Sequence, residues 1–150
     1  MVIRPVEVSD SKEWQRLRVA LYSDPDPLEI THWFETRANG GTPLVGEEVI
    51  VADRGNGQLA GFVEVGSRNY AEGCVSSPVA YLEGWYVDPE FRRAGLGTRL
   101  FEAAEAWARQ NGYTEMGSDA EFGNSISEQA HASLGFTEVE RQICFRKSLL

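Results

Sequence analysis

The sequence has little cysteine, no long apolar run and few basic residues, and each shortage narrows the possible functions. Its two cysteines, Cys74 and Cys144, stand far apart and outside any CxxC or Cys/His cluster, so neither a zinc site nor a disulfide framework is indicated. No apolar run reaches membrane-spanning length, and the N-terminus lacks the apolar core of a signal peptide. We therefore expect a cytoplasmic protein that contacts no membrane and holds no metal.

The shortage of basic residues limits the kinds of ligand or macromolecule that the protein can bind. The chain has 14 lysines and arginines against 23 acidic residues, for a net charge of -9. A phosphate-binding surface needs basic residues, so nucleic acid is excluded as a partner. The acidic surplus either attracts a cationic substrate or only keeps the protein soluble. With 150 residues, 42% of them hydrophobic, we expect one domain over residues 1–150 with a sizeable core.

Hydrophobic periodicity predicts an α/β chain. Helices are expected at residues 10–22, 28–38, 96–111 and 124–134. Strands are expected at residues 2–6, 48–54, 59–65, 81–87, 114–119 and, as one long or two short closing strands, 137–147. Asp10 and Glu13 have the spacing of a capping box at the start of the first helix. The strands before residue 96 should be antiparallel, whereas a β-α-β crossover makes the next pair parallel.

The central stretch, residues 81–98, couples a strand to a glycine-containing turn. Asp88-Pro89 ends the strand, and Arg92-Arg93-Ala94-Gly95-Leu96-Gly97-Thr98 leads into the next helix. Glycines let a backbone approach a ligand, and the N–H groups at a helix N-terminus attract anions such as a pyrophosphate. The R-x-x-G-x-G spacing is neither the dinucleotide-binding nor the P-loop pattern. The alternative is a plain connection between strand and helix.

This turn resembles that of the GNAT superfamily of acyl-CoA-dependent N-acetyltransferases, as does the order of elements over nearly all of the chain. A second family motif reads Asn124, Ala130-His131 and Leu134-Gly135-Phe136. The resemblance implies a GNAT fold, a central mixed and mostly antiparallel sheet splayed at strands 4 and 5 and flanked by helices. It also implies acetyl-CoA as cosubstrate. The cofactor-binding residues that it implies are Trp85, Tyr86, Val87, Arg92, Arg93, Ala94, Gly95, Leu96, Gly97, Thr98, Asn124, Ser127 and His131.

Direct attack of an amine on the thioester requires a group that takes up the amine's proton and one that protonates the thiolate. Glu83, an ionisable residue in an apolar strand, either faces a cleft or is paired. Asp119 ends the next strand and is either a second candidate base or a turn cap. His131, standing where many relatives carry tyrosine, is the candidate acid or a helix histidine bonded to a carbonyl. Tyr70, on a long loop, either offers its hydroxyl to the substrate or packs on the surface.

Five blocks carry a closer resemblance, to the aminoglycoside 6'-N-acetyltransferases of a chromosomal type. They are Asn69-Tyr70…Gly73-Cys74…Ser76-Ser77-Pro78, Leu82-Glu83-Gly84, Ser118-Asp119, Asn124…Ile126-Ser127 and Leu134-Gly135-Phe136…Glu140-Arg141. This resemblance implies acetylation of the 6'-amine of a cationic aminoglycoside, antibiotic resistance and a homodimer. The substrate-binding residues that it implies are Tyr22, Asp24, Asp26, Tyr70, Glu83, Asp119 and Glu140.

Several alternatives stay open at this point. Asp24 and Asp26 are either rim carboxylates or the caps of a solvated, proline-rich turn. The enzyme could instead acetylate another small amine, such as a polyamine, a metabolite or a peptide N-terminus. From another class, the chain could be a non-catalytic acyl-CoA-binding sensor.

Overall fold

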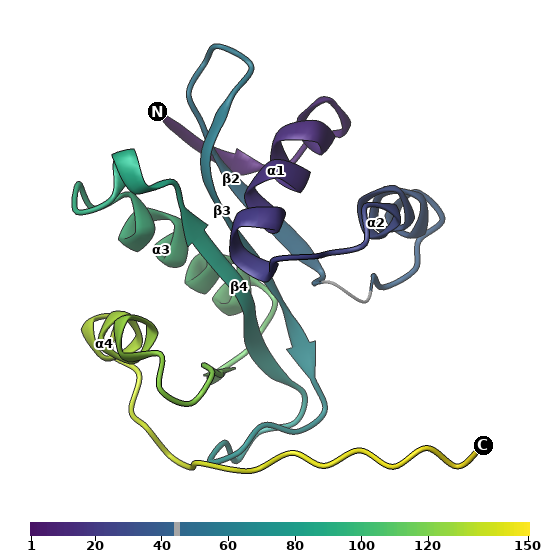
Figure 1. Ribbon diagram of the computed structural model, residues 1–150, viewed down its shortest axis with the longest axis vertical. Helices are drawn as coiled ribbons and strands as arrows, with labels where there is room; N and C mark the ends of the chain where they lie inside the picture. Colours follow the sequence, from purple (N-terminus) through teal and green to yellow (C-terminus); the bar gives the residue numbers. More distant parts are fainter. Residues whose placement is uncertain (44–45) are drawn as a thin grey trace. The chain divides into compact units, whose positions relative to one another are not determined.

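The computed structural model describes residues 1–43 and 46–150, and it divides into two compact units, residues 1–119 and 120–150. The first unit is built on a five-stranded sheet whose strands lie side by side in sequence order (Figure 1). These strands are β1 (Val2–Pro5), β2 (Glu48–Asp53), β3 (Leu59–Arg68), β4 (Val79–Val87) and β5 (Met116–Ser118). Neighbours are antiparallel except β4 and β5, which are parallel. The predicted mixed, mostly antiparallel sheet is confirmed.

Helices cover the two faces of this sheet, with α1 and α2 on one side and α3 on the other (Figure 1). Their bounds are α1 (Ser11–Tyr22), α2 (Leu28–Ala38) and α3 (Leu96–Gln110). A 3-10 turn, η1 (Val8–Asp10), precedes α1, and a second, η2 (Pro89–Phe91), follows β4. Among the described residues, no helix has the length and apolar character needed to cross a bilayer.

The core between α1, α2 and the sheet is aromatic. Trp14 and Trp33, buried on α1 and α2, meet edge to face with ring centroids 5.3 Å apart. They pack with Val51 and Phe62, which face each other across the β2–β3 ladder. Such large rings bury much apolar surface per residue, so this layer fixes where α1 lies on the sheet.

Asp10 stands at the N-cap position of α1, as predicted, but its side chain makes no capping hydrogen bond. The Asp10 carboxylate accepts from the Arg4 guanidinium at 2.7 Å and from the Glu7 amide at 2.8 Å. Arg4 thereby holds the pKa of Asp10 below its usual range. Glu13 instead accepts from the Leu59 amide at 3.1 Å. The predicted Asp10/Glu13 capping box is wrong because both carboxylates have partners elsewhere in the fold.

Two irregularities in β4 shape its middle. The pairing with β5 ends at Leu82 and Ser118, so β4 continues to Val87 beside β3 alone. This is the predicted splay between strands 4 and 5. One residue later along β4, the ladder with β3 is irregular. Glu64 pairs with Gly84 while the next β3 residue pairs with Leu82, which leaves Glu83 as the extra residue of a β-bulge.

The second unit contains α4 (Ser125–Ser133), whose N-terminus is capped by the Asn124 side chain, which accepts from the Ser127 amide at 3.1 Å. The closing strand predicted at residues 137–147 is wrong, because the structure has no strand there and residues 137–150 are all exposed. A β-propensity pattern forms a strand only where another backbone pairs with it. The prediction of a single domain stays a prediction.

Candidate active site

A buried carboxylate lies under the bulge. Glu64 is 1% exposed and accepts hydrogen bonds from Trp14 Nε1 at 3.1 Å, Arg18 Nε at 2.9 Å and the Tyr22 hydroxyl at 2.8 Å. Burial raises the pKa of Glu64, and the Arg18 guanidinium and the other two donors oppose that shift. All three donors belong to α1, so this one side chain fixes the end of the helix against β3.

The Tyr22 hydroxyl consequently lies against the bulge backbone. A Cβ atom built on Gly84 would come within 1.9 Å of this oxygen. Only glycine fits at residue 84 in this arrangement, which explains the glycine in the middle of a strand. Burial, together with the neighbouring Glu64 carboxylate, raises the pKa of Tyr22, so this phenol keeps its proton.

Glu83, the predicted base, forms an ion pair with a residue that the sequence did not single out. Arg68 Nε and Nη2 donate to the two Glu83 carboxylate oxygens at 3.0 and 2.8 Å. The Glu83 side chain is 25% exposed and that of Arg68 is 44% exposed, so the pair is open to solvent. The two alternatives for Glu83 are therefore both partly right, because it is paired and it also reaches the surface.

The second predicted carboxylate, Asp119, accepts a hydrogen bond from the Tyr81 hydroxyl at 2.5 Å. Burial and this hydrogen bond raise the pKa of Tyr81, which therefore acts as a neutral donor. The Arg68 guanidinium lies over the same tyrosine ring, 3.6 Å from its centroid. Glu83 and Asp119 are thus joined through the Arg68–Tyr81 stack, and the sequence prediction that they share a site is consistent with this geometry.

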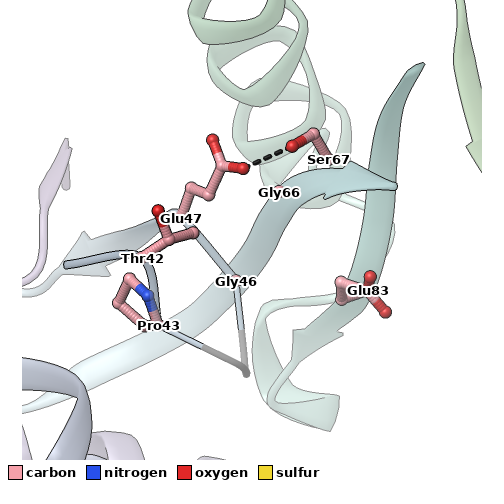
Figure 2. A pocket seen from close by; sticks show the side chains of 7 residues that line it. All are labelled: Thr42, Pro43, Gly46, Glu47, Gly66, Ser67 and Glu83. Atoms are coloured by element: carbon pink, nitrogen blue, oxygen red, sulfur yellow. Dashed lines mark hydrogen bonds between the residues drawn. The ribbon is translucent and has the colours of Figure 1, made fainter. Parts of the chain in front are cut away.

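A hollow of about 50 Å³ adjoins Glu83. Figure 2 shows Glu47 and Ser67 pointing toward each other across it, joined by a hydrogen bond, with the Glu83 carboxylate directed away from them. The residues that line it are Thr42, Pro43, Gly46, Glu47, Gly66, Ser67 and Glu83. It is smaller than the pockets that enclose drug-sized ligands, so a large substrate would lie over an open surface here.

The long loop between β3 and β4 carries Tyr70, which is 68% exposed. The loop is held by Glu115, whose carboxylate accepts from the Val75 and Ser76 amides at 2.9 and 2.7 Å. Tyr70 therefore projects from an anchored loop, in agreement with the idea that its hydroxyl is available to a ligand.

The predicted rim residues lie between α1 and α2. Asp24 and Asp26 are exposed, and Asp26 Oδ1 accepts from the Leu28 amide at 2.9 Å, as the capping alternative expected. Tyr22 precedes them and is 38% exposed, with its hydroxyl turned inward to Glu64. Only the ring of Tyr22 is thus presented to solvent.

The predicted cofactor turn follows β4. Arg93 and Gly95 both have positive φ, 63° and 77°, and no side chain of the described residues caps the start of α3 at Leu96. Residues 92–95 are exposed. Left-handed residues beside an uncapped helix N-terminus turn successive backbone N–H groups toward solvent, and this arrangement suits a pyrophosphate.

The strand and the turn are held together by side chains. Trp85 Nε1 donates to the Gly97 carbonyl at 3.1 Å, and Arg92 Nε donates to the Val87 carbonyl at 2.8 Å. The Arg92 guanidinium also lies 5.4 Å from the Tyr86 ring centroid. Trp85 and Arg92 therefore fix the path of the backbone where acetyl-CoA is expected to bind.

The remaining predicted residues belong to the second unit. His131 Nδ1 lies 2.7 Å from the Ser127 carbonyl oxygen, which matches the helix-histidine alternative and assigns a hydrogen to Nδ1 in the neutral ring. The side-chain Oδ1 of Asn124 accepts from the Ser127 amide and so caps the N-terminus of α4. Glu140 is exposed.

Sequence reasoning missed Arg68, Tyr81 and Glu64. Arg68 and Tyr81 meet Glu83 and Asp119 only through strand register, for which a single sequence holds no signal. Glu64 did carry a signal, because a carboxylate in the apolar run LAGFVEV must be paired when that strand is buried.

Comparison with known proteins agrees with this fold. The model of the acetyltransferase (GNAT) family matches residues 9–136, and the chain belongs to this family. The aminoglycoside N(6')-acetyltransferase type 1 of Klebsiella aerogenes is 44% identical over 149 residues, covering 99% of this chain and 97% of the relative. That of Stenotrophomonas maltophilia is 38% identical, covering 98% and 93%.

Solved structures show the same likeness. The apo aminoglycoside 6'-N-acetyltransferase AAC(6')-IG from Acinetobacter haemolyticus matches with a TM-score of 0.86 at 35% identity, over 99% of each chain. AAC(6')-Iy in complex with the bisubstrate analog CoA-S-monomethyl-acetylneamine matches with a TM-score of 0.82 at 34% identity, over 98% of this chain and 97% of the other.

The contact between Tyr22 and Gly84 leads to a prediction. We expect Gly84→Ala to lower the free energy of unfolding by about 1–3 kcal/mol, because the added methyl overlaps the Tyr22 hydroxyl. In the Tyr22→Phe background the same change should cost less, since the overlapping oxygen is gone. Urea unfolding of the four proteins gives the coupling energy. Additive costs would show that this contact does not select glycine.

Proposed function

We propose that the protein transfers the acetyl group of acetyl-CoA to the 6'-amine of aminoglycoside antibiotics and so confers resistance. The observation that carries the proposal is the placement of Glu83 and Asp119, joined through Arg68 and Tyr81, where β4 and β5 part. The full-length similarity to enzymes named for this reaction supports it. A substrate with several ammonium groups is stabilised by such carboxylates.

The reaction proceeds by direct attack in a ternary complex. The neutral amine nitrogen attacks the thioester carbonyl carbon, the C–S bond breaks, the amine loses a proton and the thiolate gains one. A relative that binds an analogue joining coenzyme A to acetylneamine supports a site that holds the two substrates together. No covalent acyl-enzyme is needed, and the chain's own groups position the amine and handle the protons.

We assign roles to the site residues on this basis. Glu83 and Asp119 hold the 6'-ammonium and accept its proton, directly or through water, and Tyr70 contacts the sugar from its loop. The Tyr22 ring provides a flat surface beside the bulge, because its hydroxyl is engaged with Glu64. In its doubly protonated form, His131 gives the thiolate the Nε2 proton, since Nδ1 faces the Ser127 carbonyl oxygen. Asp24 and Asp26 lie at the rim and attract the other ammonium groups.

Acetyl-CoA binds along β4 and the turn that follows it. The backbone of Trp85–Val87, which has no β5 neighbour, pairs with the pantetheine arm and polarises the acetyl carbonyl. The N–H groups of Arg93–Thr98 bind the pyrophosphate at the start of α3. Asn124 and Ser127 complete the cofactor site. The reaction takes place in the cytoplasm, where acetyl-CoA is available.

The active form is a homodimer in this proposal. The segment after α4 exposes Val139, Ile143 and Phe145, which are 61%, 81% and 91% accessible. These residues lie an even number of positions apart, so in an extended strand they share one face, and that face needs a cover. β5 is the edge strand of the sheet in the described structure, so the backbone N–H and C=O groups on its outer side are available to pair with another strand. Pairing with the partner's segment would bring its Glu140 to the substrate.

A thiol-release assay with acetyl-CoA tests the function. We expect kanamycin-type substrates with a 6'-amine to release coenzyme A and their 6'-hydroxyl analogues not to, because a hydroxyl is a poorer nucleophile and makes no ion pair. Spermidine serves as the probe for the rival class of small amines. Turnover of spermidine alone, or equal turnover of both aminoglycosides, would contradict the proposal.

The carboxylates are tested by charge removal. Glu83→Gln and Asp119→Asn should each lower kcat/KM for a 6'-amine by about 10²-fold or more, as loss of a base or an orienting group does. Glu48→Gln is the matched control, since Glu48 is also a strand glutamate paired with an arginine, Arg37, at 2.8 Å. Wild-type kcat/KM in both site variants would remove the assigned roles.

Light scattering tests the dimer. The wild-type protein should have twice the mass of one 16.7 kDa chain, and Ile143→Asp with Phe145→Asp should shift it toward a single chain because charges cannot be buried in the interface. Val8→Asp, at a residue 70% exposed on η1, is the control and should leave the mass unchanged. A wild-type mass of one chain would rule the dimer out.

A further inference from the structure

Glu83 already holds a cation that belongs to the protein. Arg68, at the end of β3, makes both hydrogen bonds of a fork with the two Glu83 oxygens, at 3.0 and 2.8 Å. Its guanidinium carbon also lies over the Tyr81 ring, 3.6 Å from the centroid. A guanidinium matches a carboxylate better than any other side chain, so this is a well-formed ion pair.

The position of this ion pair conflicts with simple substrate binding. A 6'-ammonium needs the same Glu83 carboxylate that Arg68 occupies, and a guanidinium bonded to both oxygens offsets its charge and makes it a poorer acceptor of a proton from an amine. At the same time Arg68 is 44% exposed and Glu83 is 25% exposed. Ion pairs this open to water are weak, so a competing cation can replace the guanidinium.

We propose that Arg68 is a specificity-determining residue, a resident cation that occupies Glu83 until the ammonium of the substrate displaces it. This inference rests on the proposed function and adds that a cation of the protein competes with the substrate for Glu83. Ligands without an ammonium at the reacting position leave the Arg68–Glu83 pair in place and bind only through their other groups. Arg68 therefore weakens the binding of every cation at Glu83 while it keeps that carboxylate paired in the resting enzyme.

The opposite role makes the opposite prediction. If Arg68 served to orient Glu83 for the reaction, its removal would raise KM or Kd and lower kcat. If it competes with the substrate, its removal strengthens binding of the 6'-amine. The sign of the change in affinity separates the two.

The experiment is calorimetric titration of the full chain with kanamycin and with its 6'-hydroxyl analogue. For Arg68→Gln we expect Kd for kanamycin to fall roughly threefold to tenfold, the range of a lost exposed ion pair and cation–π contact. Kd for the 6'-hydroxyl analogue should change less, so the ratio between the two ligands rises. Arg68→Lys keeps a cation without the fork and should lie between wild type and Arg68→Gln.

Arg37→Gln is the matched control, because Arg37 also pairs with a strand glutamate, Glu48, and lies 4.7 Å from the centroid of an aromatic ring, that of Trp33. It should leave both Kd values unchanged. Weaker kanamycin binding by Arg68→Gln, or equal gains for both ligands, would overturn the proposal. A gain as large in Arg68→Lys as in Arg68→Gln would also overturn it, because charge would not be the cause.

A second measurement does not depend on any variant. The side-chain Nε–H signal of Arg68 in the NMR spectrum of the wild-type protein should shift when kanamycin is added and stay in place with the 6'-hydroxyl analogue. An unmoved signal at saturating kanamycin would overturn the proposal. Failure of the proposed function would be seen separately, as absence of coenzyme A release when the same protein preparation is given acetyl-CoA and kanamycin. The Kd values and the Nε–H signal report on Arg68 alone.

Discussion

The arrangement of the site depends on one buried carboxylate. Glu64 takes three donors from a single helix, α1, at distances of 2.8 to 3.1 Å. Removing one partner of a buried ion pair typically costs about 3–5 kcal/mol, so the Arg18–Glu64 pair strongly favours this one position of the helix. The end of α1 in turn places the Tyr22 hydroxyl against Gly84, and with it the bulge that presents Glu83 at the surface.

Most of the fold could be predicted from sequence because its elements carry strong local patterns. The apolar spacing of α3 and the glycine turn before it define that helix to within one residue at its end. The predictions failed where a partner outside the helix or strand itself decides the outcome. Asp10 is drawn to Arg4, Glu13 to the Leu59 amide, and residues 137–147 have a strand pattern without a strand. Sequence periodicity carries no information about such partners.

The site shows the same division between local and distant information. Glu83 stood out as a charge in an apolar strand and Asp119 as a carboxylate at a strand end, both of which are local features. Arg68 lies 15 positions before Glu83, and the two meet because the β3–β4 hairpin has one register and one bulge. A shift of one residue would turn the arginine to the other face of the sheet. Its role was therefore visible only in three dimensions.

Asp119 and Glu83 have different partners within the protein, a neutral tyrosine and a charged arginine. We therefore expect them to play different roles in binding a cation. Tyr81 donates to Asp119 as a neutral phenol, so the hydrogen bond that Asp119 accepts brings no positive charge to it. The charge of Glu83 is offset by Arg68 until that arginine is displaced. In the proposed binding sequence, Asp119 and the acidic surface attract the ammonium first, since the Arg68 fork takes up Glu83 and acts on Asp119 only across the Tyr81 ring. Glu83 is engaged second, by exchange of one cation for another. In this proposal, the net charge of the chain brings a cation to the site, and Arg68 decides which cation is held there.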